Sequence, residues 1–341
     1  METGNAIELK GVTKRFGDVI ANDNVNLTVR KGEILSILGE NGSGKTTLMN
    51  MLSGIYFPDE GEVYVDGKEV TIRSPKDSFA LGIGMIHQHF KLINILTAAE
   101  NIILGLPGKE KLNMKQVEKE IRELTEQYGF DLNPSQKIYD MSVSQKQTVE
   151  IVKVLYRGAD ILILDEPTAV LTPQETEKLF AVLRNMRKAG KSIIIITHKL
   201  NEVLELSDRV AVLRKGKYID TVETAKATVE SLTEMMVGEK VKLDINRTEP
   251  VGAEKRIEMR GITCRNKEGL KVLTEASFTA YSGEILGVAG ISGSGQKELL
   301  ESVAGLQPIE SGEILYFSPE GTTEKISEMK AEDIKNLGIT L

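Results

Sequence analysis

The chain has 341 residues and a formal net charge of −7, with 40 % apolar and 27 % charged residues. This composition excludes a chain that is disordered or collagen-like throughout, and the acidic balance argues against a surface that coats nucleic acid. Its one cysteine, Cys264, allows no internal disulfide, and no secretory signal begins the chain. No apolar run approaches the roughly 18 residues of a membrane span. We therefore expect a soluble intracellular protein, and the length suggests about two domains.

The first distinctive element is an apolar run at residues 33–38 followed by a glycine-rich loop. Residues 39–46 match the phosphate-binding loop pattern in full and precede an apolar helix start. Glycines let successive backbone N–H groups point at one phosphate chain, Lys45 reaches the terminal phosphates, and the Thr46 hydroxyl can ligate Mg²⁺. A glycine-rich turn with an incidental lysine is the alternative, and the strand and helix contexts disfavour it. The predicted nucleotide-binding residues are Gly39, Glu40, Asn41, Gly42, Ser43, Gly44, Lys45, Thr46 and Thr47.

Further along, residues 113–128 place apolar side chains on one face of a helix, within a helical insert expected around residues 92–160. The next apolar run, 161–164, reads as a buried strand and ends in two carboxylates. Ligands bind at such strand ends in open α/β sheets, so Asp165 is predicted to hold magnesium and Glu166 to polarise an attacking water. Two solvated acids are the alternative, and the loop at 39–46 favours the catalytic interpretation.

The following elements complete an alternation of strands and helices. Residues 174–189 have helical spacing after a capping box at Thr172, with proline at the first helical position. The run 193–196 fits another strand buried on both faces of a parallel sheet. We therefore predict an α/β fold, complete within residues 1–238.

A polar, proline-containing segment at residues 239–254 is predicted to be a linker, because an internal repeat begins after it. The tetrapeptide at 32–35 recurs at 283–286, and glycines at 39, 44, 54 and 61 have counterparts at 290, 295, 305 and 312. Residues 255–341 therefore form a second, truncated copy, in which the part of the first copy beyond Met85 has no counterpart. Its loop is degenerate: Gln296 replaces the lysine and Lys297 replaces the hydroxyl, so this copy should bind nucleotide poorly.

These motifs together resemble the ATP-binding subunits of ABC transporters, over nearly all of residues 5–240 and the partial copy. The resemblance implies a P-loop NTPase fold of the ABC-ATPase type, with ATP and Mg²⁺ as cofactors. It also implies four further site elements. The ordinary alternative for the phenylalanine among them is a core residue, and that for the histidine is a surface residue. The four elements are Phe16 stacking on adenine, Gln88 sensing the γ-phosphate and magnesium, a signature motif containing Ser142, Ser144 and Gln145, and His198 holding the γ-phosphate and the catalytic Glu166. The signature departs from the family pattern, because Val143 and Ser144 stand where paired glycines are usual.

Two unequal copies resemble the fused ATPases of simple-sugar and nucleoside importers, and residues 72–76 and 87–90 resemble the nucleoside branch. The resemblance implies a peripheral protein at the cytoplasmic face of the membrane, which energises import. Its direct partners would be integral membrane permease subunits and a head-to-tail ATPase domain, and its indirect partner would be an extracytoplasmic solute-binding protein. The apolar segment 90–106 is either a permease contact or ordinary core. The alternative function is a nucleotide-binding fragment that is hydrolytically idle because the second signature is missing. A cytosolic ABC protein acting on ribosomes or DNA is disfavoured by the acidic balance, so no nucleic-acid partner is expected.

Overall fold

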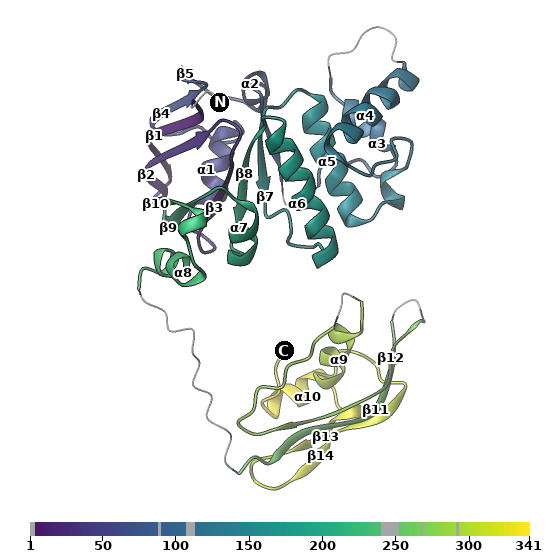
Figure 1. The fold of residues 1–341 in the computed structure, drawn as a ribbon. Helices are drawn as coiled ribbons and strands as arrows, with labels where there is room; N and C mark the ends of the chain where they lie inside the picture. The colour runs from purple at the N-terminus through teal and green to yellow at the C-terminus, as the bar shows by residue number, and fades with distance from the viewer. Residues whose placement is uncertain (1–3, 88–89, 107–112, 240–251, 267–268, 291–292) are drawn as a thin grey trace. The chain divides into compact units, whose positions relative to one another are not determined.

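The computed structural model describes residues 4–87, 90–106, 113–239, 252–266, 269–290 and 293–341. The chain divides into two compact units, Met1–Leu243 and Asp244–Leu341 (Figure 1). Within the described residues, none of the helices combines the length and the apolarity that a bilayer crossing requires.

A six-stranded sheet in the order β10-β9-β3-β8-β7-β6 forms the centre of the first unit. Its strands pair in parallel except for the β9–β10 hairpin. All residues of β3 and β8 are buried, including Ser36, Ser192 and Thr197, as their largely apolar sequences predict. The bounds are β3 (Ile34–Leu38), β6 (Ile83–Ile86), β7 (Ile161–Asp165), β8 (Ser192–Thr197), β9 (Arg209–Arg214) and β10 (Lys217–Glu223).

Helices cover both faces of this sheet, because successive residues of a strand point to opposite sides. Ile194 belongs to the same core cluster as Leu48 of α1, whereas Ile193 clusters with Phe180 of α6. Helix α6 begins at the predicted capping box, in which Thr172 is the N-cap and proline is the first helical residue. The helices are α1 (Lys45–Leu52), α2 (Pro75–Ala80), α6 (Pro173–Lys188), α7 (Leu200–Leu206) and α8 (Val229–Val237), with the 3₁₀ turn η2 (Thr224–Lys226).

An antiparallel sheet in the order β2-β1-β4-β5 packs on the other side of α1. It supplies Ile7 and Val25 to the core cluster that contains Leu48. The strands are β1 (Asn5–Phe16), β2 (Val19–Arg30), β4 (Glu60–Val65) and β5 (Lys68–Val70).

In the described residues, the segment between β6 and β7 forms α-helices and one 3₁₀ turn, and an isolated β-bridge joins Thr97 to Lys137. Its helices enclose a core of their own, which includes Ile102, Ile121 and Val149. The predicted helix at 113–128 forms with Asn113 as its N-cap. The elements are α3 (Ala98–Ile103), α4 (Met114–Tyr128), η1 (Ile138–Asp140) and α5 (Val143–Tyr156).

The second unit contains a four-stranded sheet in the order β12-β11-β13-β14, with a core that includes the buried, free Cys264. This order corresponds to β2-β1-β4-β5 of the first unit. Residues 283–288 are the counterpart of residues 32–37, which include most of β3, yet they form no strand, and Ile285 is fully exposed. The elements are β11 (Lys255–Arg265), β12 (Lys271–Tyr281), α9 (Gln296–Val303), β13 (Ser311–Phe317), β14 (Thr323–Lys325), η3 (Ile326–Glu328) and α10 (Ala331–Asn336).

Candidate active site

The glycine-rich loop joins the end of β3 to the start of α1, and its conformation depends on glycine at two close approaches. A Cβ at Gly39 would lie 2.3 Å from the Leu213 carbonyl oxygen, and one at Gly44 would lie 2.3 Å from the Ala21 carbonyl oxygen. Gly44 also has a φ of 95°, in the left-handed region that other residues avoid. The loop therefore curls with little room for side chains, as a phosphate-binding nest requires.

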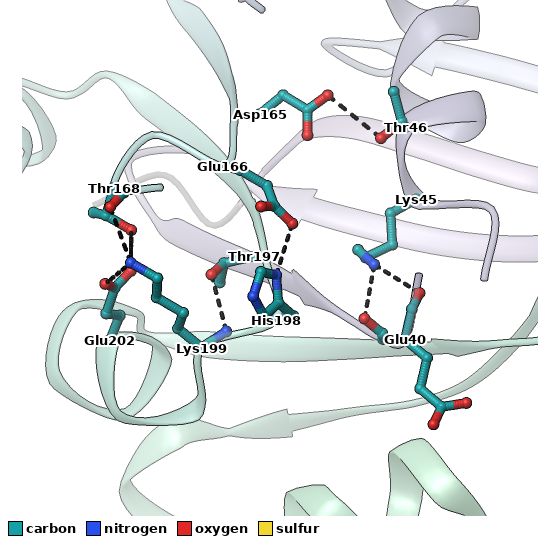
Figure 2. A network of polar contacts seen from close by, with 11 residues as sticks. Glu40, Lys45, Thr46, Asp165, Glu166, Thr168, Thr197, His198, Lys199 and Glu202 are labelled. Carbon is teal, nitrogen blue, oxygen red and sulfur yellow. Dashed lines mark hydrogen bonds and ion pairs between the residues drawn. The ribbon is translucent and has the colours of Figure 1, made fainter. Parts of the chain in front are cut away.

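Lys45 folds back over this loop. Its ammonium donates hydrogen bonds to the Gly39 carbonyl oxygen at 2.7 Å and to the Glu40 carbonyl oxygen at 2.9 Å (Figure 2). Burial lowers the pKa of Lys45, and the carboxylates of Glu166 and Asp165 partly oppose this effect. The loop thus presents a cation next to its backbone N–H groups, which suits a polyanion.

Asp165, at the end of β7, faces the first turn of α1. The Thr46 hydroxyl donates a hydrogen bond of 3.3 Å to Asp165 Oδ2. The pKa of Asp165 is raised, mainly by burial. The hydrogen bond from Thr46 lowers this pKa, and the Glu166 carboxylate raises it further. Among the described residues no group of three or more His, Cys, Asp or Glu side chains could hold a metal. A hydroxyl and one carboxylate are hard oxygen ligands, and they fit Mg²⁺ that takes its other ligands from phosphates and water.

Glu166 and His198 meet at the ends of the neighbouring strands β7 and β8. His198 Nδ1 lies 2.8 Å from Glu166 Oε1. The Glu166 N–H donates to the Ile196 carbonyl oxygen at 2.9 Å, and the residue has a φ of 46°. One cavity of about 660 Å³ is lined by residues 41–47, Asp165, Glu166 and His198. The structure therefore brings together the loop, both carboxylates and the histidine that the sequence singled out.

Phe16 lies outside the lining of that cavity, at the end of β1. The residue is 43 % exposed, and its ring meets the Tyr56 ring edge-on with the centroids 5.1 Å apart. The Lys14 ammonium lies 5.4 Å from the centre of the Phe16 ring. This exposure contradicts a core phenylalanine.

The three signature residues do not line the cavity around Lys45 either. Ser142 is the N-cap of α5, and it exchanges hydrogen bonds with Gln145 in a capping box: the Gln145 N–H donates to Ser142 Oγ at 3.3 Å, and the Ser142 N–H donates to Gln145 Oε1 at 2.9 Å. Ser144 and Gln145 line a different hollow, of about 460 Å³, between α5 and α6. Helix capping therefore accounts for Ser142 and Gln145 within this unit. Gln88 lies outside the described residues.

A polar network beside the Glu166–His198 pair was not predicted from the sequence. Thr168, Lys199 and Glu202 contact one another directly (Figure 2). The spacing of Lys199 and Glu202 at the start of a helix after a strand was a weak hint of an ion pair. No local pattern connects either residue to Thr168, because the contact joins two separate strand ends.

Comparison with known proteins supports the same interpretation. A family profile described as ABC transporter matches residues 22–169. The chain is 46 % identical over 336 residues to the nucleoside import ATP-binding protein NupA of Lactococcus lactis subsp. cremoris, covering 98 % of this chain and 66 % of that protein. It is 46 % identical to the guanosine import ATP-binding protein NupO of Bacillus subtilis, covering 90 % of this chain and 61 % of that protein.

The ribose import ATP-binding protein RbsA of Caldanaerobacter subterraneus subsp. tengcongensis is 38 % identical, with 98 % of this chain and 68 % of that protein covered. The crystal structure of a nucleotide-free ATP-binding cassette from an ABC transporter superposes with a TM-score of 0.60 and 26 % identity, over 72 % of this chain and 100 % of that one. The chain thus spans roughly 60–70 % of the length of these three import proteins. By sequence and by fold, it belongs to the family of ATP-binding proteins of ABC transporters.

Proposed function

We propose that this chain is an ATP-binding and ATP-hydrolysing subunit that energises import of a nucleoside or a simple sugar. The observation that carries the proposal is the single cavity in which Lys45, Asp165, Glu166 and His198 meet. Relatives named for import of nucleosides, guanosine and ribose support the solute class.

Each side chain has a task that its geometry supports. The loop N–H groups and the Lys45 ammonium hold the phosphate chain and neutralise it. Held by Thr46 and Asp165, Mg²⁺ would supply further neutralisation of the phosphate oxygens. The Glu166 carboxylate accepts a proton from the attacking water, and His198 Nδ1–H, 2.8 Å away, keeps that carboxylate oriented. Phe16 stacks on the base, and Gln88 remains the proposed sensor of the γ-phosphate and magnesium.

The test of the site is the affinity for a fluorescent ATP analogue in Lys45→Ala. Loss of a charge-assisted contact should weaken binding on the order of 10- to 100-fold. The matched control is Lys297→Ala, because Lys297 follows the second glycine loop, is exposed and pairs only at 3.6 Å with Glu301. Affinity should be unchanged in the control, and unchanged affinity in Lys45→Ala would remove Lys45 from the site.

We propose further that residues 255–341 are a partial second copy, joined to the complete ATPase domain 1–238 by the linker 239–254. Its loop sequence keeps Gly290, Gly293 and Gly295 but has no lysine at its end. The Gln296 amide donates to the Val288 carbonyl oxygen at 2.9 Å, whereas Lys45 in the first copy donates to the Gly39 carbonyl oxygen. We therefore expect one tight Mg-ATP per chain. Calorimetric titration measures this stoichiometry, and two tight sites per chain would contradict the argument.

The proposed partners are integral permease subunits, a head-to-tail ATPase domain and, indirectly, an extracytoplasmic solute-binding protein, at the cytoplasmic face of the membrane. Segment 90–106 is divided between two roles. Ile102 is fully buried in the helical core, whereas Ile93 and Ile95 are 43 % and 72 % exposed. We propose that this exposed part contacts the permease.

The second candidate is a nucleotide-binding chain that is hydrolytically idle. It is favoured by the position of Ser142 and Ser144 outside the cavity, since the site then needs a signature from another domain. Phosphate release measured across protein concentrations separates the two candidates. Turnover that rises steeply with concentration would show that two first copies pair, and absent turnover at every concentration would favour the idle chain.

A further inference from the structure

Glu166 is held in a backbone conformation that glutamate does not favour. Its φ of 46° places it among only five non-glycine residues of the described chain with positive φ. The chain turns there, since the Ala169 N–H donates to the Glu166 carbonyl oxygen at 3.2 Å. A strained residue persists only where its surroundings determine the conformation, so something beside this turn must hold it.

The contacts of Lys199 identify what holds the turn. The Lys199 ammonium donates to three acceptors: the Thr168 carbonyl oxygen at 2.9 Å, Thr168 Oγ1 at 3.1 Å and Glu202 Oε1 at 3.0 Å. The Thr168 hydroxyl in turn donates to Glu202 Oε2 at 2.5 Å. The three side chains close a triangle in which every ammonium proton has an acceptor.

This triangle connects the two segments that carry the reacting pair. Lys199 directly follows His198, and Thr168 lies two residues beyond Glu166 (Figure 2). The Lys199 N–H also donates to Thr197 Oγ1 at 3.1 Å, which fixes the chain on the other side of His198. The distance between the two strand ends is thus set by side-chain bonds as well as by the sheet.

We propose that Lys199 is a positioning residue, which clamps the 166–169 turn through Thr168 and thereby fixes Glu166 against His198. This role rests on the proposed hydrolytic function of the same site. An ordinary surface ion pair does not account for the arrangement, because such pairs contribute little and leave their partners solvated. Thr168 is only 2 % exposed, so its hydroxyl depends on these bonds, whereas its carbonyl oxygen also accepts from the Leu171 N–H at 3.4 Å.

The chain offers a matched control at the other end of β8. Lys191 also bridges a carbonyl and a carboxylate, donating to the Ala159 carbonyl oxygen at 2.9 Å and to Asp160 Oδ1 at 2.6 Å. Its loss removes the same kind of contact from the opposite end of the same strand, seven residues before His198. Comparison of Lys199→Met with Lys191→Met therefore separates positioning from general destabilisation.

The experiment uses the full chain with ¹⁵N-labelled histidine, and the His198 signals are assigned by their loss in His198→Gln. Lys199→Met should change the Nδ1 signal of His198 and lower kcat for ATP about 10- to 100-fold, the range for a misplaced reacting group, with ATP affinity within about twofold. Lys199→Arg should largely retain the His198 Nδ1 signal and the kcat of the unmodified chain, since arginine keeps the charge and several hydrogen-bond donors. Lys191→Met should change neither.

A second variant keeps the test decisive if Lys199→Met does not fold. Thr168→Val preserves the volume and removes only the hydroxyl, and it should change the His198 signal in the same direction. Unchanged His198 signals in Lys199→Met or Thr168→Val would overturn the proposal, as would an equal change in Lys191→Met. If the unmodified chain hydrolyses no ATP at any protein concentration, the idle-chain candidate is favoured over the proposed function, and the His198 signal alone decides whether the clamp exists.

Discussion

Replacing Glu166 by glycine should make the apoprotein more stable than replacing it by alanine. The left-handed conformation costs a residue with a Cβ about 1–2 kcal/mol, which glycine avoids. Glycine loses about 0.4–1 kcal/mol through the greater freedom of the unfolded chain. With φ at 46°, the balance favours Glu166→Gly over Glu166→Ala by about 0.5–1 kcal/mol.

The same pair of substitutions has the opposite sign elsewhere in this unit. Glu177 is exposed in the interior of α6, where glycine costs about 1 kcal/mol relative to alanine. Glu177→Gly should therefore be less stable than Glu177→Ala. Both positions lose a glutamate, so the comparison isolates the backbone conformation.

The assay is urea unfolding of the full chain without nucleotide. Because the chain contains two compact units, more than one transition is expected, and the transition that the Glu177 variants shift identifies the first unit. If Glu166→Gly is less stable than Glu166→Ala in that transition, Glu166 carries no backbone strain, and the argument that a clamp holds it loses its premise.

Three further predictions concern buried charge and catalysis. Arg209→Met should lower the free energy of unfolding, measured with urea, by about 3–5 kcal/mol, because it leaves the buried Glu33 carboxylate without the guanidinium that lies 3.2 Å away. The double variant Arg209→Met, Glu33→Gln should lose clearly less stability. An equal loss in both variants would mean that the unpaired charge is not the cause. Burial raises the pKa of Glu33 above its ordinary 4.5, so the folded state favours the protonated carboxyl. The stability that this group contributes is therefore fully present below its pKa in the unfolded chain, and it is lost as the pH rises through its pKa in the folded chain. Glu33→Gln should remove that part of the fall in stability measured from pH 4 upward, and an unchanged pH profile would contradict it. Glu166→Gln should retain Mg-ATP binding but hydrolyse it on the order of a hundredfold or more slowly in an assembled transporter, and near-normal phosphate release would place the base elsewhere.

The parts of the fold that the sequence predicts are those with a local physical signature. β3 and β8 are short, largely apolar runs, and α6 begins where a Thr172 capping box and a proline predict it. β1 was not predicted, because its alternation is interrupted. Its register against β2 shifts between Leu9 and Val12, beside a left-handed Gly11, so no clean period of two survives.

The candidate site divides in the same way. The phosphate loop and the two carboxylates are recognisable because each is a contiguous motif with a required neighbour. The contact between Thr168 and Lys199 is not, because it depends on two strand ends meeting and on side-chain rotamers, neither of which is encoded in a short window. The left-handed conformation of Glu166 gives no sequence signal either, since glycine, the usual marker, is absent there.

The two glycine loops separate the determinants of conformation from those of chemistry. Gly44 and Gly295 have φ values of 95° and 89°, and a Cβ on either would lie within 2.5 Å of a carbonyl oxygen of the strand beside it. At these two positions the backbone conformation therefore requires glycine. Lys45 and Gln296 occupy matching places: Lys45 donates to the Gly39 carbonyl oxygen of its loop, and Gln296 donates to the Val288 carbonyl oxygen two residues before its loop. Only the lysine brings a charge that a phosphate needs. A glycine pattern therefore predicts a fold element, whereas the residues at its end decide whether that element can act on a nucleotide.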